Sequence, residues 1–89
     1  MQPQSRNERE LVLLSKKGCH LCEAVEAEIR SLRLPATILR VLDIEEDRSL
    51  HDKYWLTIPV VRLAGVDVFD ARMMDPSGDW KRKLASLLR

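Results

Sequence analysis

Between residues 11 and 32 the spacing of apolar residues changes from that of a buried strand to that of a helix. Four apolar residues in a row, Leu11 to Leu14, are typical of a strand that is buried on both faces. A short polar loop that contains a glycine follows at residues 15–18. The pattern then predicts a helix whose buried side, at helical spacing, consists of Leu21, Ala24, Val25, Ile29 and Leu32.

Three further strands are predicted along the rest of the chain. Pro35 ends the first helix, because proline cannot continue a helix. Residues 36–42 are rich in β-branched and aliphatic side chains, and Arg40 among them indicates a half-exposed or edge strand. Residues 60–63 and 66–70 predict two strands joined by a short turn with a glycine, which is typical of a hairpin.

A short helix is predicted between the second and third strands. Asp47 and Ser49 are both candidate N-caps, and the helix is expected to end near Tyr54. Leu50 lies four residues before Tyr54, so both are expected on the buried side. Pro59 stands where the third strand begins, a position at which a sheet tolerates proline.

The last helix is predicted to begin at Asp75 and Pro76 and to run to about Arg89, because aspartate suits an N-cap and proline the first helical position. Its predicted buried side consists of Trp80, Leu84, Leu87 and Leu88. The predicted order is β-α-β-α-β-β-α, with the first two strands parallel and the last two antiparallel. The fold class is therefore α/β, a four-stranded mixed sheet with helices on both faces.

Composition and charge narrow the function classes. With 89 residues the chain has room for a single core, and a net charge of +1 gives no reason to expect nucleic acid or a membrane surface as partner. Residues 1–10 are polar and without periodicity, so we expect a flexible N-terminal segment before one domain over residues 11–89. This segment has no apolar signal-peptide core, and we expect a cytoplasmic protein.

Both cysteines of the protein, Cys19 and Cys22, fall on the first turn of the first predicted helix. Unpaired N–H groups and the positive end of the helix dipole stabilise a thiolate there, so we expect the pKa of Cys19 to be lowered. Cys22 lies about one turn further on, within reach of Cys19. Cys19 is thus able to attack a disulfide, and Cys22 to resolve the mixed disulfide.

Alternatives for this pair stay open: inert core residues, part of a zinc site, or ligands of an iron–sulfur cluster shared between two chains. A structural zinc ion needs about four Cys or His ligands, and besides the cysteines the chain has only His20 and His51. In the cytosol a Cys-x-x-Cys pair more often serves redox catalysis or metal binding than a stable disulfide. We predict the redox role, with no metal.

This order of elements, with Cys19-His20-Leu21-Cys22 opening the first helix and Thr57-Ile58-Pro59 leading into the third strand, resembles the thioredoxin-like fold. Its size makes it similar to a glutaredoxin, and most of all to small bacterial glutaredoxin-like proteins with a Cys-His-Leu-Cys site. The resemblance runs from Leu11 to the C-terminus. It implies a thiol–disulfide oxidoreductase in which Cys19 is the nucleophile and Cys22 the resolving thiol.

The resemblance also implies a substrate-binding set, composed of Lys17, His20, Thr57, Ile58 and Pro59. Pro59 would be a cis-proline that faces the cysteines, and Ile58 would offer its backbone to a thiol substrate as an added strand does. The implied partner is a disulfide-containing protein or glutathione as co-substrate, without a bound cofactor, and we expect a monomer. The alternative function is a non-catalytic binding module or a metal or iron–sulfur protein that uses the two cysteines.

Other side chains near the pair are open to two interpretations. A protonated His20 would lower the pKa of Cys19 and make the disulfide more oxidising, or it is a plain exposed side chain. Lys16 and Lys17 either attract anionic thiols such as glutathione or are only solvated. Trp55 is either a substrate contact or a cover for the core.

Two departures from typical glutaredoxins concern glutathione. His20-Leu21 replaces the Pro-Tyr pair between the cysteines, so the aromatic residue that helps to seat glutathione is missing there. The glycine pair and acidic residues that follow the fourth strand in glutaredoxins have no clean match in residues 72–79, where Asp75 and Asp79 are the nearest candidates.

Overall fold

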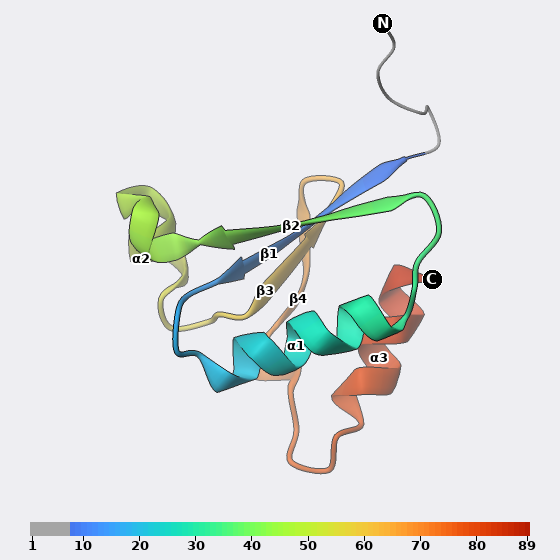
Figure 1. The fold of residues 1–89 in the computed structure, drawn as a ribbon. Coiled ribbons are helices and arrows are strands. Elements are labelled where there is room, and N and C mark those ends of the chain that lie inside the picture. Colours follow the sequence, from blue (N-terminus) through green and yellow to red (C-terminus); the bar gives the residue numbers. More distant parts are fainter. Residues whose placement is uncertain (1–7) are drawn as a thin grey trace, which may run out of the picture.

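The computed structural model describes residues 8–89 (Figure 1). The predicted order of strands and helices is confirmed, with two additional single-turn 3-10 helices, η1 and η2. No helix within this range is long and apolar enough to cross a membrane. The elements are β1 (Arg9–Ser15), α1 (His20–Ser31), β2 (Thr37–Asp43), η1 (Ile44–Glu46), α2 (Arg48–Tyr54), β3 (Val60–Leu63), β4 (Val66–Asp70), η2 (Ala71–Met73) and α3 (Trp80–Leu88).

The four strands form one mixed sheet in the order β2-β1-β3-β4. β1 and β2 are parallel, whereas β1 and β3 are antiparallel, with Leu14 opposite Val60. β3 and β4 form the predicted hairpin, with a register shift between Val61 and Arg62. Arg40 is exposed on the edge strand β2, as predicted. The predicted fold class is therefore confirmed.

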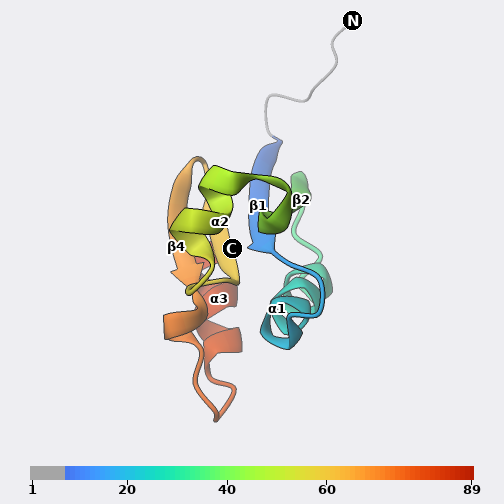
Figure 2. The same cartoon turned by 90° about the vertical axis from the view of Figure 1, so that its left-hand side faces the viewer.

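α1 and α3 lie along one face of the sheet, whereas α2 lies toward one end of it (Figures 1 and 2). Because side chains alternate along a strand, the apolar run of β1 supplies both faces. On one face α1 and α3 pack on the sheet, and the buried cluster contains Leu11, Leu13, Val25, Ile29, Val61, Phe69, Trp80, Leu84 and Leu88. On the other face η1 and α2 contribute to a smaller cluster of Leu14, Ile44, Tyr54 and Val60.

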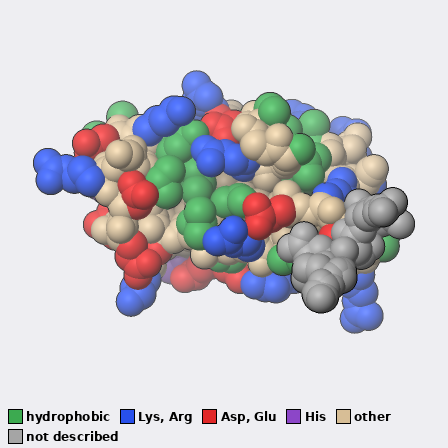
Figure 3. Space-filling view, turned by 90° about the horizontal axis from the view of Figure 1, so that it is seen from above, with side chains coloured by type: hydrophobic (Ala, Val, Ile, Leu, Met, Phe, Trp, Pro, Cys, Tyr) green, Lys and Arg blue, Asp and Glu red, His purple; other side chains and the backbone are tan. Residues whose placement is uncertain are grey.

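The second face is covered only in part. Figure 3 views this face and shows an apolar strip bordered by charged side chains. A hollow on it is lined, among others, by Val12 and Leu42 and by two arginines, Arg40 and Arg62. Arg40 is paired with Glu10 across the strands, at 3.1 Å between Nη1 and Oε2.

Helix α1 buries a different stripe from the predicted one. Its buried residues are Cys22, Val25 and Ile29, whereas Leu21 is 50% exposed and Ala24 is also at the surface. The prediction that Leu21 and Ala24 face the core is wrong. A cysteine side chain behaves as a small apolar group, and Cys22 completes the helical spacing instead. Leu21 is thereby left at the surface within the cysteine motif.

The last helix begins later than predicted, at Trp80 instead of Pro76, with Asp79 as its N-cap residue. Gly78 has a φ of +86°, a left-handed conformation that a continuous helix excludes. The predicted cap, Asp75, nevertheless contacts the helix start, because its Oδ1 accepts the N–H of Trp80 at 2.9 Å.

Two further expectations are corrected. β1 begins at Arg9 and not at Leu11, so the first strand extends into the segment expected to be flexible. The Arg9 guanidinium donates to the Leu88 carbonyl and to the Thr37 hydroxyl, which holds this polar residue in the strand. Residues 1–7 of that segment lie outside the described residues.

In α3, Leu87 is 42% exposed and does not belong to the buried side.

The short helix α2 follows its prediction. Of the two candidate caps, Asp47 is the one used, and its Oδ1 accepts the N–H of Leu50 at 3.1 Å. Tyr54 is buried, and the half-buried Leu50 packs against the same cluster. The unpredicted η1 and η2 each follow a strand, and the aspartate before each of them, Asp43 or Asp70, accepts a backbone N–H of the turn.

Candidate redox site

The topology brings the two predicted site segments to one end of the sheet. Leu14, near the end of β1, lies opposite Val60 at the start of β3. The turn that follows β1 and the residues that precede β3 therefore lie at the same end. Figures 1 and 2 both show the turn into α1 and the connection from α2 to β3 there. The cysteine motif thus lies on the same side of the molecule as Thr57, Ile58 and Pro59.

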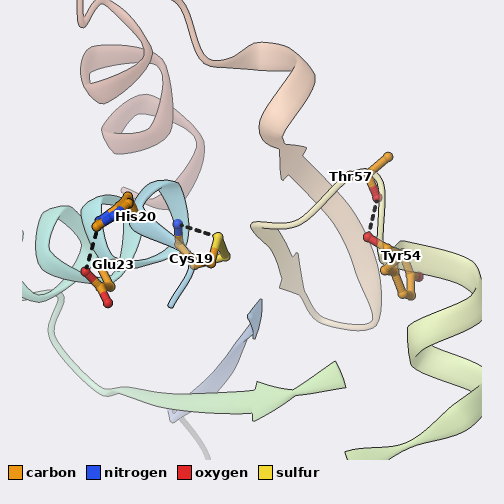
Figure 4. Close-up of a disulfide and its surroundings, with 6 residues drawn as sticks. Cys19, His20, Glu23, Tyr54 and Thr57 are labelled. Carbon is orange, nitrogen blue, oxygen red and sulfur yellow. Dashed lines mark hydrogen bonds and ion pairs between the residues drawn. A yellow bond between two sulfur atoms is a disulfide. The ribbon is translucent and has the colours of Figure 1, made fainter. Parts of the chain in front are cut away.

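Cys19 and Cys22 differ in exposure. Cys19 is the N-cap residue of α1 and is half-buried, whereas Cys22 is 1% exposed. Their sulfurs form a disulfide, with the two Cα atoms 5.2 Å apart (Figure 4). The N–H of Cys22 donates to Cys19 Sγ at 3.2 Å, so an amide of the helix N-terminus is directed at the more accessible sulfur. This asymmetry suits the predicted roles of nucleophile and resolving thiol.

The charged side chains of the motif do not converge on the sulfurs. The His20 side chain is 97% exposed, and its Nδ1 lies 3.9 Å from Glu23 Oε1. Figure 4 shows it directed toward Glu23 and away from the disulfide. Lys16 and Lys17 are exposed in the turn and line a shallow hollow. Three carboxylates line the same hollow: Glu23, Glu26 and Asp43.

The main chain of Tyr54 holds the segment that leads to Pro59. Its carbonyl accepts the N–H groups of Thr57 and Ile58 at 2.9 and 3.1 Å and the Thr57 hydroxyl at 3.3 Å (Figure 4). The Ile58–Pro59 peptide bond is cis, as the resemblance implied, and Pro59 is buried. Because the Ile58 N–H already donates within the chain, a strand-like substrate would compete with Tyr54 for it.

The Tyr54 side chain is a contact that the sequence did not predict. Its hydroxyl donates to Asp67 Oδ2 at 2.7 Å and accepts from Arg62 Nη2 at 2.7 Å. Arg62 Nε also donates to Asp67 Oδ1 at 2.8 Å. We refer to Tyr54, Arg62 and Asp67 as the tyrosine clamp. The alternating pattern of β4 gives no signal for it, because the pairing of Arg62 with Asp67 depends on the register shift in the hairpin.

The clamp perturbs the titration of its charged members. Burial raises the pKa of Asp67, but the hydrogen bonds from Arg62 and Tyr54 outweigh it and leave the pKa lowered. The pKa of Arg62 is raised, chiefly by its hydrogen bond to Asp67. Both groups are therefore held in their charged forms.

Large apolar side chains are exposed at this end of the molecule. Leu56 is 73% exposed, Trp55 55% and Leu21 50%. The interpretation of Trp55 as a cover for the core is therefore wrong. The Trp55 ring stacks on His51, with centroids 6.4 Å apart and planes inclined by 12°.

Residues 8–89 offer no set of metal ligands within one chain. No three His, Cys, Asp or Glu side chains in that range are grouped so that they could hold a metal ion. His51, the histidine outside the cysteine motif, has its two ring nitrogens 3.5 Å from a carboxylate oxygen of Glu45 and 3.5 Å from one of Asp52.

The fold together with a Cys-x-x-Cys pair at the start of its first helix defines a thioredoxin-fold protein with a cysteine motif of the redox type. A family model described as "Glutaredoxin-like domain (DUF836)" matches residues 10–86. The chain belongs to this glutaredoxin-like family.

Two solved structures are similar to the chain. The solution NMR structure of protein Ne2328 from Nitrosomonas europaea has a TM-score of 0.67 and 26% sequence identity, covering 100% of both chains. A mutant thioredoxin from Halobacterium salinarum NRC-1 has a TM-score of 0.59 and 20% identity, covering 92% of this chain and 73% of that one. The likeness to the thioredoxin confirms the thioredoxin-like fold and carries no more than that. No curated protein matches the sequence.

Proposed function

We propose that the protein is a thiol–disulfide oxidoreductase whose dithiol–disulfide couple is Cys19 and Cys22. The observation that carries the proposal is the asymmetry of the pair. The half-buried Cys19 sulfur accepts an N–H from the first turn of α1, whereas Cys22 lies buried behind it. A thiolate at Cys19 gains from that hydrogen bond and from the positive end of the helix dipole, and thiolates are the attacking species in exchange.

The proposed reaction has two steps. In the reduced protein the Cys19 thiolate attacks one sulfur of a substrate disulfide, forms a bond to it, and the other substrate sulfur leaves as a thiolate and takes up a proton. The Cys22 thiolate then attacks Cys19 Sγ, which forms the intramolecular disulfide and releases the second substrate thiol. Each cysteine gives its proton to solvent when it forms the thiolate, and each released substrate thiolate takes one up, so two electrons and two protons pass from the dithiol to the substrate in total. A reducing thiol restores the dithiol by the reverse sequence.

The same proposal includes the substrate, the co-substrate, the cellular location and the oligomeric state. The substrate is a protein disulfide or a low-molecular-weight disulfide, and glutathione is the candidate co-substrate. No bound cofactor is needed, since the two sulfurs carry the electrons themselves. We place the protein in the cytoplasm as a monomer. Support for the redox role comes from family membership and from the pair at disulfide distance.

The variant Cys22→Ser separates the two steps. It keeps the attacking Cys19 but lacks the resolving thiol, so glutathione disulfide should convert it to a stable mixed disulfide with one glutathionyl group on Cys19. Intact-mass spectrometry followed by peptide mapping measures the adduct and its place. Cys19→Ser is the matched control and should form far less adduct, because its remaining sulfur is buried. Equal labelling of the two variants, or none in either, would contradict the assignment of roles.

A further inference from the structure

Tyr54 attaches the short helix α2 to the sheet. Of the seven described residues of α2 it is the buried one, with 6% of its surface exposed. Its ring packs in one cluster with Leu14, near the end of β1, and Val60, at the start of β3. Its hydroxyl bonds to Arg62 on β3 and to Asp67 on β4, both at 2.7 Å. Packing and two hydrogen bonds therefore fix the place of Tyr54 on the sheet.

The main chain of Tyr54 in turn holds the segment between α2 and β3. The Tyr54 carbonyl accepts the N–H groups of Thr57 and Ile58 at 2.9 and 3.1 Å and the Thr57 hydroxyl at 3.3 Å. The Thr57 carbonyl is bound from a second side, by the Ala71 N–H of η2 at 3.1 Å. The Ile58 N–H depends on Tyr54, so a shift of α2 against the sheet is passed on to the residues just before Pro59.

This segment lies beside the turn that carries Cys19. Leu14 is opposite Val60 in the sheet, so the chain that leaves β1 passes Pro59, which directly precedes Val60. The Cys19 N–H donates to the Lys16 carbonyl at 3.3 Å, which closes a four-residue turn and keeps Cys19 close to the end of β1. Figure 4 shows the chain that enters β3 beside the disulfide. The segment thus forms one side of the space in which a substrate of Cys19 has to lie.

Disulfide exchange depends on the shape of this space more than other reactions of a thiolate do. The attacking sulfur has to lie in line with the sulfur–sulfur bond that breaks, so the substrate must be held in one direction from Cys19. A misplacement of about 1 Å is able to lower the rate about a hundredfold. Alkylation by a small reagent such as iodoacetamide requires the thiolate but no second sulfur held in line. The two reactions together therefore distinguish the reactivity of the sulfur from the positioning of the substrate.

We infer that Tyr54 is a positioning residue for the exchange reaction. Through the tyrosine clamp it fixes the segment from Thr57 to Pro59 beside Cys19, and this segment keeps the substrate disulfide in line with the attacking sulfur. Tyr54 acts through the segment and not on the sulfur itself, since its hydroxyl bonds to Arg62 and Asp67. This inference rests on the proposed function and adds to it the contact that sets the rate of exchange.

The test compares the full-length wild type with Tyr54→Phe, each reduced with dithiothreitol and then freed of it. Phenylalanine keeps the buried ring and removes both hydrogen bonds of the hydroxyl. Two second-order rate constants are measured at neutral pH, one for reduction of glutathione disulfide and one for alkylation of Cys19 by iodoacetamide. We expect the first to fall about tenfold in the variant, because the substrate is held less well in line. The second should change by less than about twofold, with the same pH profile, because the sulfur keeps its surroundings.

A second clamp variant and a matched control complete the set. Asp67→Ala removes the acceptor of the same hydroxyl and should also slow the reduction of glutathione disulfide while sparing alkylation. The double variant should lose no more than about twofold beyond Tyr54→Phe, because the two changes break one contact. Leu88→Val is the control for lost stability. Leu88 is fully buried in α3 and its carbonyl accepts from Arg9, at the opposite end of the sheet, so its replacement should leave both rates as in the wild type.

The possible outcomes distinguish this inference from the function on which it rests. Unchanged reduction of glutathione disulfide by both clamp variants would overturn the positioning role of Tyr54 and leave the exchange reaction intact. An equal fall of exchange and alkylation would also overturn it, because it would indicate a displaced Cys19, and so would an equal fall of exchange in Leu88→Val. A wild type that is alkylated but does not reduce glutathione disulfide would overturn the exchange reaction and the positioning role together.

Discussion

The Cys19 sulfur is the single atom on which the proposed chemistry depends most. It accepts the Cys22 N–H at 3.2 Å, and a thiolate gains more from such a bond than a neutral thiol does. The sequence also suggested His20 as an influence, but its side chain is 97% exposed and directed at Glu23. The helix N-terminus is therefore the stronger influence on this sulfur in the structure.

Tyr54 stabilises the fold through its hydroxyl group as well as through its buried ring. Tyr54→Phe keeps the buried ring and removes the hydroxyl that bonds to Asp67 and Arg62. We expect the free energy of unfolding, measured by urea denaturation, to fall by about 1–2 kcal/mol. Arg40→Gln is the control, because it removes an exposed ion pair with Glu10 that contributes ~0–1 kcal/mol. A loss for Tyr54→Phe no larger than the control would contradict the clamp.

At the scale of elements, Asp67 connects β4 to α2 through Tyr54 and to β3 through Arg62. Its pKa is lowered in the folded state because these hydrogen bonds outweigh the effect of burial. A lowered carboxyl pKa means that ionised Asp67 stabilises the fold above the pKa of an unfolded aspartate. That stabilisation is lost as the pH falls through the folded pKa.

The corresponding prediction concerns the pH dependence of stability. As the pH falls below about 4, where an unfolded aspartate titrates, the wild type should lose unfolding free energy more steeply than Asp67→Asn does. Urea denaturation at a series of pH values from neutral down to about pH 3 measures both slopes. Asp70 and Asp75 also have lowered pKa values and remain in both proteins, so the difference isolates Asp67. Parallel slopes would contradict the assigned role.

The elements show which parts of the structure the sequence could predict. The change of period between β1 and α1 is a local signal, and it placed the transition from the strand to the helix correctly. The buried stripe of α1 was misplaced because Cys22 was not counted as apolar, although it is 1% exposed. The start of α3 was misplaced because Asp75 and Pro76 match a helix start, whereas the left-handed Gly78 delays the helix to Trp80.

At the scale of the whole molecule, α1 and α3 close one face of the sheet over a single cluster. Leu84 is fully buried in α3, whereas Leu87 is 42% exposed. We expect Leu84→Ala to lower the unfolding free energy by about 2–4 kcal/mol. Leu87→Ala should lower it by less than about 1 kcal/mol. Denaturant unfolding of the two variants measures the difference, and similar losses would contradict the observed orientation of the helix.

The sequence predicted the residues to which we assign the chemistry of the candidate site, but not the hydrogen bonds around them. The motif at Cys19 and Cys22 and the segment from Thr57 to Pro59 are sequence signals, and the topology places both at one end of the sheet. The donation of the Ile58 N–H to Tyr54 and the tyrosine clamp depend on the path of a short connection and on a hairpin register shift. No local pattern encodes either, which is why a fold alone does not name a substrate.

The central claim is that Cys19 and Cys22 form an exchangeable couple within one chain. Its most direct test is equilibration of the protein in glutathione buffers of graded redox poise, followed by trapping of free thiols and mass spectrometry. We predict loss of two hydrogens from the pair along one two-electron transition with a definable midpoint. Cysteines that stay reduced across the whole range, or that oxidise only by linking two chains, would contradict the account.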